Sequence, residues 1–201
     1  MYKIQTLKGL KTNLYIDGTN LFVGLIDLFG LKNLPKFSSI LKEINKIVKV
    51  DQIFFYASYT PPSNKKYKNS IITEAKFYKQ VIETPDLIFY KGHRSLTSGK
   101  EKGVDVHLAV DIIKHGFENK YQQMIIFTGD ADLCYPLEIV KEFGKSTFAV
   151  FLPNRFSLGI SHRANSSFIL NYLDKFKSIR KDLPATLKIL KVKNPVRKRT
   201  R

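Results

Sequence analysis

The fold is decided by the stretch Asn13-Leu14-Tyr15-Ile16-Asp17-Gly18. This short apolar run ends at an Asp-Gly pair, and residues compatible with a helix follow it. An apolar run of this length that is bounded by a turn signal is typical of a buried strand. We therefore expect a strand that passes through a tight turn into a helix, which would be the first strand–helix unit of the fold.

The same alternation continues along the chain. Apolar, β-rich runs predict strands at residues 52–58, 87–90, 124–128 and 146–151, and a last or edge strand at 167–170. A period of 3.6 residues predicts helices at residues 38–50, behind serine caps, and at 65–83, 104–117 and 133–143, with another leading into the tail after residue 170. Strands that alternate with helices imply parallel construction. The sequence thus predicts an α/β fold with a central, mostly parallel sheet.

The chain is strongly basic, with 34 Lys and Arg against 17 Asp and Glu and a net charge of +17. Residues 175–201 hold eleven basic side chains and one acidic side chain, so +10 of this charge lies there. Such an excess favours a polyanionic partner such as RNA, although a charged run can equally be a solvated tail. We expect a lead-in at residues 1–12, one domain at 13–174 and a basic extension at 175–201.

Several protein classes are disfavoured by the composition. No apolar run approaches the roughly 20 residues that a membrane helix needs, and the first residues show no secretory signal. We therefore expect a cytoplasmic protein without a membrane partner. Cys134 is the only cysteine, which excludes an internal disulfide and a cysteine-based zinc site. A metal ion would be held by oxygen.

Four aspartates fall where ligands bind in α/β folds. Asp17 follows the first expected strand, Asp130 and Asp132 follow the strand at 124–128, and Asp105 opens a helix. Ligands of open α/β sheets bind beyond the carboxyl ends of the strands. Four carboxylates gathered there would repel one another unless a cation neutralised them, and an all-oxygen set suits Mg²⁺ or Mn²⁺. The chemistry this predicts is hydrolysis of a phosphodiester by metal-activated water.

Each aspartate has a simpler interpretation. An Asp after a strand is commonly a helix N-cap or an Asx-turn residue, and this holds for Asp17, Asp105 or Asp130 taken singly. The run Gly129-Asp130-Ala131-Asp132 differs, because it places two carboxylates where one cap would suffice. The hypothesis depends on the four acids occurring together.

Other polar residues are candidates for supporting roles. Asn20 could bind a carboxylate or a scissile phosphate, or only close its own turn. Thr128 could hold a ligand carboxylate through its hydroxyl. Asp111 lies some 120° around the helix from Asp105 by the 3.6-residue period, so a structural or supporting role is expected.

Phosphate contacts are expected from the polar, basic loop before Asp105. Arg94, Lys100 and Lys102 are the candidates there, although so basic a chain is expected to have exposed basic loops in any case. The histidines show no metal-ligand spacing, and none is expected to take part directly in chemistry; they are His93, His107, His115 and His162.

The chain resembles the NYN domains of the PIN-like superfamily, particularly their bacterial LabA-like branch. The resemblance covers about residues 13–170 and is carried by Leu14-Tyr-Ile-Asp-Gly-Thr-Asn20, Lys102-Gly-Val-Asp-Val-His-Leu-Ala-Val-Asp111, Ile126-Phe-Thr-Gly-Asp-Ala-Asp-Leu-Cys-Tyr-Pro136 and Gly144-Lys145. It implies a Rossmann-like, three-layer α/β/α sandwich with a central, mostly parallel sheet, an acidic pocket for Mg²⁺ or Mn²⁺, and RNA cleavage. On matching positions it implies that Asp17, Asp105, Asp130 and Asp132 bind the metal, with Asn20 beside them. No acid near Glu74 clearly corresponds to the mid-chain carboxylate of some PIN relatives.

Two other functions compete with a ribonuclease. Tyr15-Ile16-Asp17-Gly18-Thr19 mimics the signature of haloacid-dehalogenase phosphatases, but Tyr15 would then stand at the nucleophile and Cys134 at a required acid. A non-catalytic RNA-binding or protein-interaction module is the alternative left open, since a fold can outlive its activity. A homodimer is also left open.

Overall fold

A seven-stranded sheet forms the centre of the computed structural model, which describes residues 10–58, 68–94, 101–170, 172 and 187–190. All neighbouring strands of this sheet are parallel, in the order β3-β2-β1-β6-β7-β8-β9. The strands are β1 (Thr12–Asp17), β2 (Gln52–Ala57), β3 (Leu87–Lys91), β6 (Gln123–Phe127), β7 (Ser146–Phe151), β8 (Ser166–Leu170) and β9 (Leu187–Leu190). The predicted parallel sheet is confirmed.

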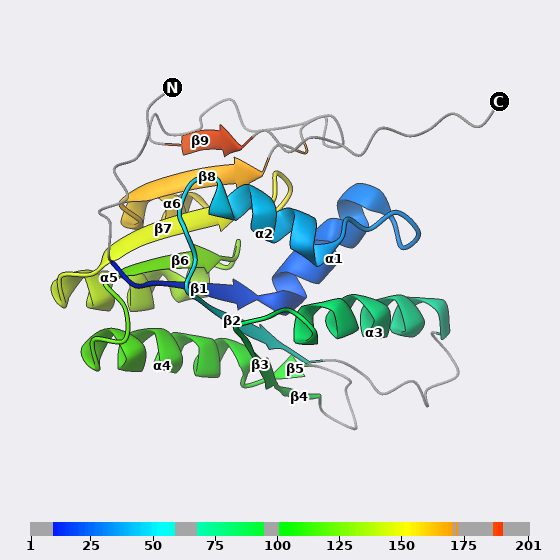
Figure 1. Ribbon diagram of the computed structural model, residues 1–201, viewed down its shortest axis with the longest axis horizontal. Helices are drawn as coiled ribbons and strands as arrows, with labels where there is room; N and C mark the ends of the chain where they lie inside the picture. The colour runs from blue at the N-terminus through cyan, green and yellow to red at the C-terminus, as the bar shows by residue number, and fades with distance from the viewer. Residues whose placement is uncertain (1–9, 59–67, 95–100, 171, 173–186, 191–201) are drawn as a thin grey trace.

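Helices cover both faces of the sheet (Figure 1), which confirms the three-layer sandwich. One face carries α1 (Gly18–Phe29), α2 (Phe37–Asn45) and α3 (Lys68–Ile82). The other face carries α4 (Val104–Phe117), α5 (Cys134–Glu142) and α6 (Leu158–Arg163). Two smaller elements complete the described structure, a hairpin of β4 (His93–Arg94) and β5 (Glu101–Lys102) and a 3₁₀ turn, η2 (Ala131–Leu133).

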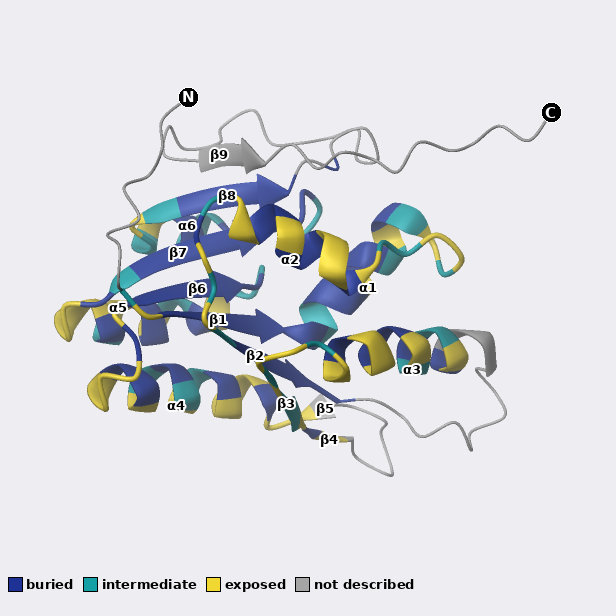
Figure 2. Ribbon diagram, viewed as in Figure 1, coloured by how far each residue is buried: buried dark blue, intermediate teal, exposed yellow. Residues whose placement is uncertain are grey.

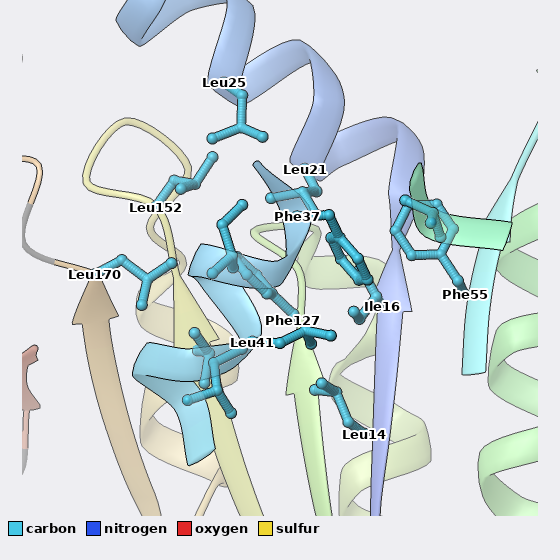
Figure 3. Close-up of a cluster of buried hydrophobic side chains, with 14 of the residues drawn as sticks. Leu14, Ile16, Leu21, Leu25, Phe37, Leu41, Phe55, Phe127, Leu152 and Leu170 are labelled. Atoms are coloured by element: carbon cyan, nitrogen blue, oxygen red, sulfur yellow. The ribbon is translucent and has the colours of Figure 1, made fainter. Parts of the chain in front are cut away.

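The central strands are buried on both faces, as Figure 2 shows. In β1, Leu14 and Ile16 pack with α1 and α2, while Tyr15 points into the opposite core. This alternation follows from the two-residue period of a strand. In Figure 3, Leu14 and Ile16 lie with Leu21 of α1 and Phe127 of β6 in one apolar cluster. A strand buried on both faces is apolar throughout, which is why the run before Asp17 is so uniform.

The chain changes direction across the sheet between β1 and β6. From β1 it runs outward to β2 and β3, then returns to β6 on the other side of β1 and continues through β7 and β8. The loops that follow β1 and β6 turn to opposite faces of the sheet, so a crevice opens at the carboxyl ends of these two strands. Asp17 is the last residue of β1, which places it at this crevice.

Some predicted boundaries were wrong. Helix α2 begins at Phe37 after Lys36, with no side-chain cap, so the serines expected as caps lie inside its first turn. It ends at Asn45 rather than at residue 50, because the side chain of Asn45 accepts a hydrogen bond from Val50 N at 2.9 Å. Helix α6 and the β4–β5 hairpin were not predicted. Strand β9 pairs with β8 inside the stretch expected to be the basic extension, and most of the helix expected there falls outside the described residues.

Within the part of the chain that the structure describes, no helix is both long and apolar enough to cross a membrane.

Candidate active site

A pocket of about 320 Å³ lies at the crevice between β1 and β6. Three of the four predicted acids line it, Asp17, Asp105 and Asp130, together with Asn20. They come from three separate parts of the chain: the β1–α1 turn, the start of α4 and the turn after β6. Its other described lining residues are Thr19, Val23, Gly103, Val104 and Arg155.

Asp17 is a helix cap and a pocket residue at once. Its side chain is buried, with 4% exposure, and Oδ1 accepts a hydrogen bond from Asn20 N at 2.9 Å, which caps α1. Its other oxygen, Oδ2, accepts a hydrogen bond from the hydroxyl of Thr128 at 2.9 Å. The capping interpretation is therefore correct for Asp17, and it coexists with a place in the pocket.

Asp130 is held by the turn that follows β6. Its backbone N–H donates to Thr128 Oγ1 at 3.0 Å, and its Oδ1 accepts from Asp132 N at 3.0 Å, which caps η2. Gly129 N donates to Asn20 Oδ1 at 3.1 Å, so the side chain of Asn20 joins this turn to α1. The turns that carry Asp17 and Asp130 are thus linked directly by hydrogen bonds.

Two glycines let the chain come this close. A β-carbon on Gly129 would lie 2.2 Å from the carbonyl oxygen of Arg155, so the segment between β7 and α6 packs against the turn of Asp130. Gly103 has a φ of 78°, a left-handed conformation that favours glycine, and it turns the chain from β5 into α4. Asp105 then falls in the first turn of α4, where the helix dipole favours a negative charge.

The donor set of the pocket fits a hard divalent cation. Carboxylate and amide oxygens are the ligands that Mg²⁺ and Mn²⁺ prefer. Among the described residues, no three His, Cys, Asp or Glu side chains stand close enough together to hold one ion. Mg²⁺ is usually bound through one or two carboxylates, with water and substrate phosphate completing its shell. The acids of the pocket fit an ion that is bound through one or two carboxylates, with water and substrate phosphate as its other ligands.

Two predicted acids lie outside the pocket lining. Asp132 is exposed on η2, and its backbone N–H supports Asp130. Asp111 of α4 accepts a hydrogen bond from the Tyr56 hydroxyl at 2.8 Å. Burial, together with this bond to Asp111, raises the pKa of Tyr56. Asp111 thus joins α4 to β2, in line with the structural role expected for it.

The predicted phosphate-binding residues lie in or beside the β4–β5 hairpin. Lys102 is exposed on β5, next to the pocket residue Gly103. Arg94 lies on β4, opposite Glu101 in the hairpin. Lys100 lies outside the described residues, so its prediction has no structural counterpart.

None of the four histidines is among the described lining residues of the pocket. His115 is buried, its Nδ1 lies 2.9 Å from the Tyr15 hydroxyl, and burial lowers its pKa. His107 is exposed, and its ring stacks on Tyr90 with 4.3 Å between the ring centroids. Both contacts are structural.

Arg155 is the charged pocket residue that sequence reasoning missed. It lies in the loop between β7 and α6, beyond the carboxyl end of a strand, so the positional rule that located the aspartates could have found it. Basic residues that follow the carboxyl end of a strand can reach the crevice as acidic residues do.

Comparisons with known proteins agree with this architecture. The sequence matches the NYN domain family over residues 11–173, a range that includes every acid of the pocket. The crystal structure of a protein of unknown function from Vibrio parahaemolyticus is similar, with a TM-score of 0.61 and 12% sequence identity, over 83% of this chain and 96% of that chain. At this identity the likeness shows the fold alone. No curated protein matches this chain. On the family match, the chain belongs to the NYN domain family, within the PIN-like superfamily.

Proposed function

We propose that this protein is a ribonuclease that hydrolyses RNA phosphodiester bonds with Mg²⁺ or Mn²⁺ at the pocket of Asp17, Asp105 and Asp130. The observation that carries the proposal is that three acids from separate chain segments line one pocket at the switch point of the sheet. Membership of the NYN family supports it, since NYN domains are generally ribonucleases. The net charge of +17 favours a polyanionic substrate.

In this proposal the ion binds among Asp17, Asp105 and Asp130, through one or two of their carboxylates at a time, with water and substrate phosphate as its other ligands, and Asp132 is a further acid close by. When bound, such an ion lowers the pKa of a bound water and stabilises negative charge on the phosphate. The protein contributes the positions of the acids. Two hydrogen bonds of 2.9 Å fix the carboxylate of Asp17, so it needs little reorganisation when substrate arrives.

Basic residues that precede Asp105 in the sequence are proposed to contact the RNA. Lys102, which is exposed beside Gly103, is proposed to contact the RNA backbone, with Arg94 and Lys100 in the same segment. Asn20 is proposed to keep the turn of Asp130 in place through Gly129 rather than to touch the phosphate.

The test is a cleavage assay on single-stranded RNA with a titration of Mg²⁺ and Mn²⁺. Asp130→Asn should abolish cleavage and leave RNA binding intact. Glu142→Gln is the matched control, since Glu142 is an exposed carboxylate of α5 away from the pocket lining. Equal cleavage by Asp130→Asn would point to a contaminating nuclease.

The same assay separates the ribonuclease from a non-catalytic module. A module would bind RNA with the affinity expected of a basic protein, yet the wild-type protein would not cleave it at any concentration of either ion. That result would overturn the proposed function.

A further inference from the structure

Arg155 brings a positive charge into an otherwise acidic pocket. It lines the pocket with Asp17, Asp105 and Asp130, and it is the one Lys or Arg among the described lining residues. A nuclease pocket made only of acids would repel the phosphates of its substrate. A positively charged residue in the lining reduces that repulsion.

Both ends of Arg155 are held in place. Its carbonyl oxygen packs against Gly129, next to the acid turn, and its side chain crosses α1 at Gly24, where a β-carbon would lie 2.8 Å from Cγ. Nη2 then donates to Asp27 Oδ2 at 2.6 Å. The neighbouring Asn154 fixes the same loop, because its Nδ2 donates to Gly24 O at 3.0 Å. The side chain is therefore oriented before any substrate binds.

The guanidinium has donors to spare. Arginine carries five N–H donors. Among the described residues Nη2 of Arg155 donates to Asp27, and Nε is buried without a hydrogen bond, so the donors left for a phosphate are those of Nη1 and the second N–H of Nη2. The ion pair lies at the surface, with the side chains of Arg155 and Asp27 33% and 52% exposed, so it is weak and screened by salt. A phosphate can accept two parallel hydrogen bonds from a guanidinium, which makes it a stronger partner.

We propose that Arg155 is a substrate-binding residue, whose guanidinium binds a backbone phosphate of the RNA that occupies the pocket, with Asp27 holding the side chain ready in the free protein. This inference rests on the proposed ribonuclease function. It assigns to the loop between β7 and α6 the role of placing RNA across the acids.

Four variants test the inference by steady-state cleavage, with thermal unfolding measured for each. Arg155→Gln should raise KM about tenfold, the loss expected for one charge-assisted hydrogen bond, with a smaller change in kcat. Arg155→Lys should recover part of that loss, since it keeps the charge without the planar fork. Asp27→Asn should leave KM within about twofold of wild type, because an exposed ion pair contributes little.

Arg163→Gln is the matched control. Arg163 is also a partly exposed arginine paired with a surface carboxylate, Glu138, but it does not line the pocket. The KM of Arg163→Gln for RNA should equal that of the wild type. If Asp27→Asn harms KM and thermal stability as much as Arg155→Gln does, Arg155 only ties the loop to α1, and the inference is overturned.

RNA binding measured by fluorescence anisotropy in EDTA separates the two proposals. If the wild type does not cleave RNA, the ribonuclease proposal fails. Arg155 is still supported as an RNA contact if Arg155→Gln weakens RNA binding and lowers the slope of log Kd against log salt by about 0.7, the value for one phosphate of a single strand. If the wild type cleaves but Arg155→Gln keeps both its KM and its binding, the inference alone fails. If the wild type neither cleaves nor binds RNA, both fail.

Discussion

The hydroxyl of Thr128 donates a hydrogen bond to Oδ2 of Asp17 at 2.9 Å and so joins the ends of two adjacent strands. Oγ1 of Thr128 also accepts a hydrogen bond from Asp130 N at 3.0 Å. One buried hydroxyl therefore sets the positions of two acids that lie 113 residues apart in the chain. A valine has nearly the same shape but makes neither bond.

Thr128→Val should lower both activity and stability. It would leave a buried carboxylate oxygen and a backbone N–H without their partner, at a cost of about 1–3 kcal/mol in the free energy of unfolding. Activity should fall about 10- to 100-fold, as is usual when a group that orients ligand carboxylates is removed. Urea denaturation and kcat measure the two effects. Thr128→Ser, which keeps the hydroxyl, should recover most of the activity and most of the stability. A Ser variant as defective as the Val variant would show that the hydrogen bonds of the hydroxyl do not carry the effect.

Substitutions at Asp17 should separate its capping role from its proposed role in catalysis. Asp17→Asn keeps an oxygen that can accept from Asn20 N, and its Nδ2 can donate to Thr128 Oγ1 in place of the bond that Oδ2 accepts. Its stability should therefore stay close to that of the wild type while RNA cleavage is abolished. Asp17→Ala should also abolish cleavage, and it should unfold with a free energy lower by about 1 kcal/mol, the usual value of an N-cap. Cleavage by Asp17→Asn at the wild-type rate would remove Asp17 from the chemistry.

Much of the sheet could be predicted because its strands are buried on both faces. A run such as Leu14-Tyr15-Ile16 has to be apolar at every position, which gives a strong local signal. The places of Asp17 and Asp130 followed from their strands, since the carboxyl ends of parallel strands meet at one edge. The position of Asp105 beside the other acids was also predicted, because the family resemblance and its place at the start of a helix both pointed to it.

Arg155 follows a strand and could have been found by its position, but the contacts that hold it join distant parts of the chain. Nothing local shows that Arg155 crosses α1 at Gly24, or that Gly129 meets the carbonyl group of Arg155. The start of α2 was misplaced because serines resemble caps in a sequence, whereas the structure begins the helix at Phe37, whose side chain is fully buried. Burial there outweighs the preference for a polar cap.

Stability should fall as the pH drops below the ordinary pKa of histidine, because of His115. Burial lowers its pKa in the folded protein, although Asp111 opposes this effect and Lys120 adds to it. Between an unfolded-state pKa of about 6.5 and the lower folded-state value, the unfolded chain binds the proton more readily. The contribution of His115 to stability is therefore complete above that range and is lost as the pH falls through it.

Urea denaturation of the wild type and of His115→Gln at pH 7.5 and 5.5 checks this prediction. In the variant the free energy of unfolding should differ less between the two pH values than it does in the wild type, since glutamine does not titrate. His162→Gln is the control, because His162 is exposed on α6. An unchanged pH dependence in His115→Gln would assign the effect to other groups.

The basic tail should add to RNA affinity through charge alone. Deleting residues 175–201 is a poor test, because it would also remove β9 and leave the edge of β8 unpaired. Replacing Arg197, Lys198, Arg199 and Arg201 with serine removes four charges beyond β9 and leaves that strand intact. If these residues bind RNA, the slope of log Kd against log salt should fall by about 0.7 for each phosphate that the variant no longer neutralises, while cleavage at saturating RNA stays unchanged. A slope equal to that of the wild type would show that the tail is only a solvated appendage, and the remaining charge of the domain would then account for binding.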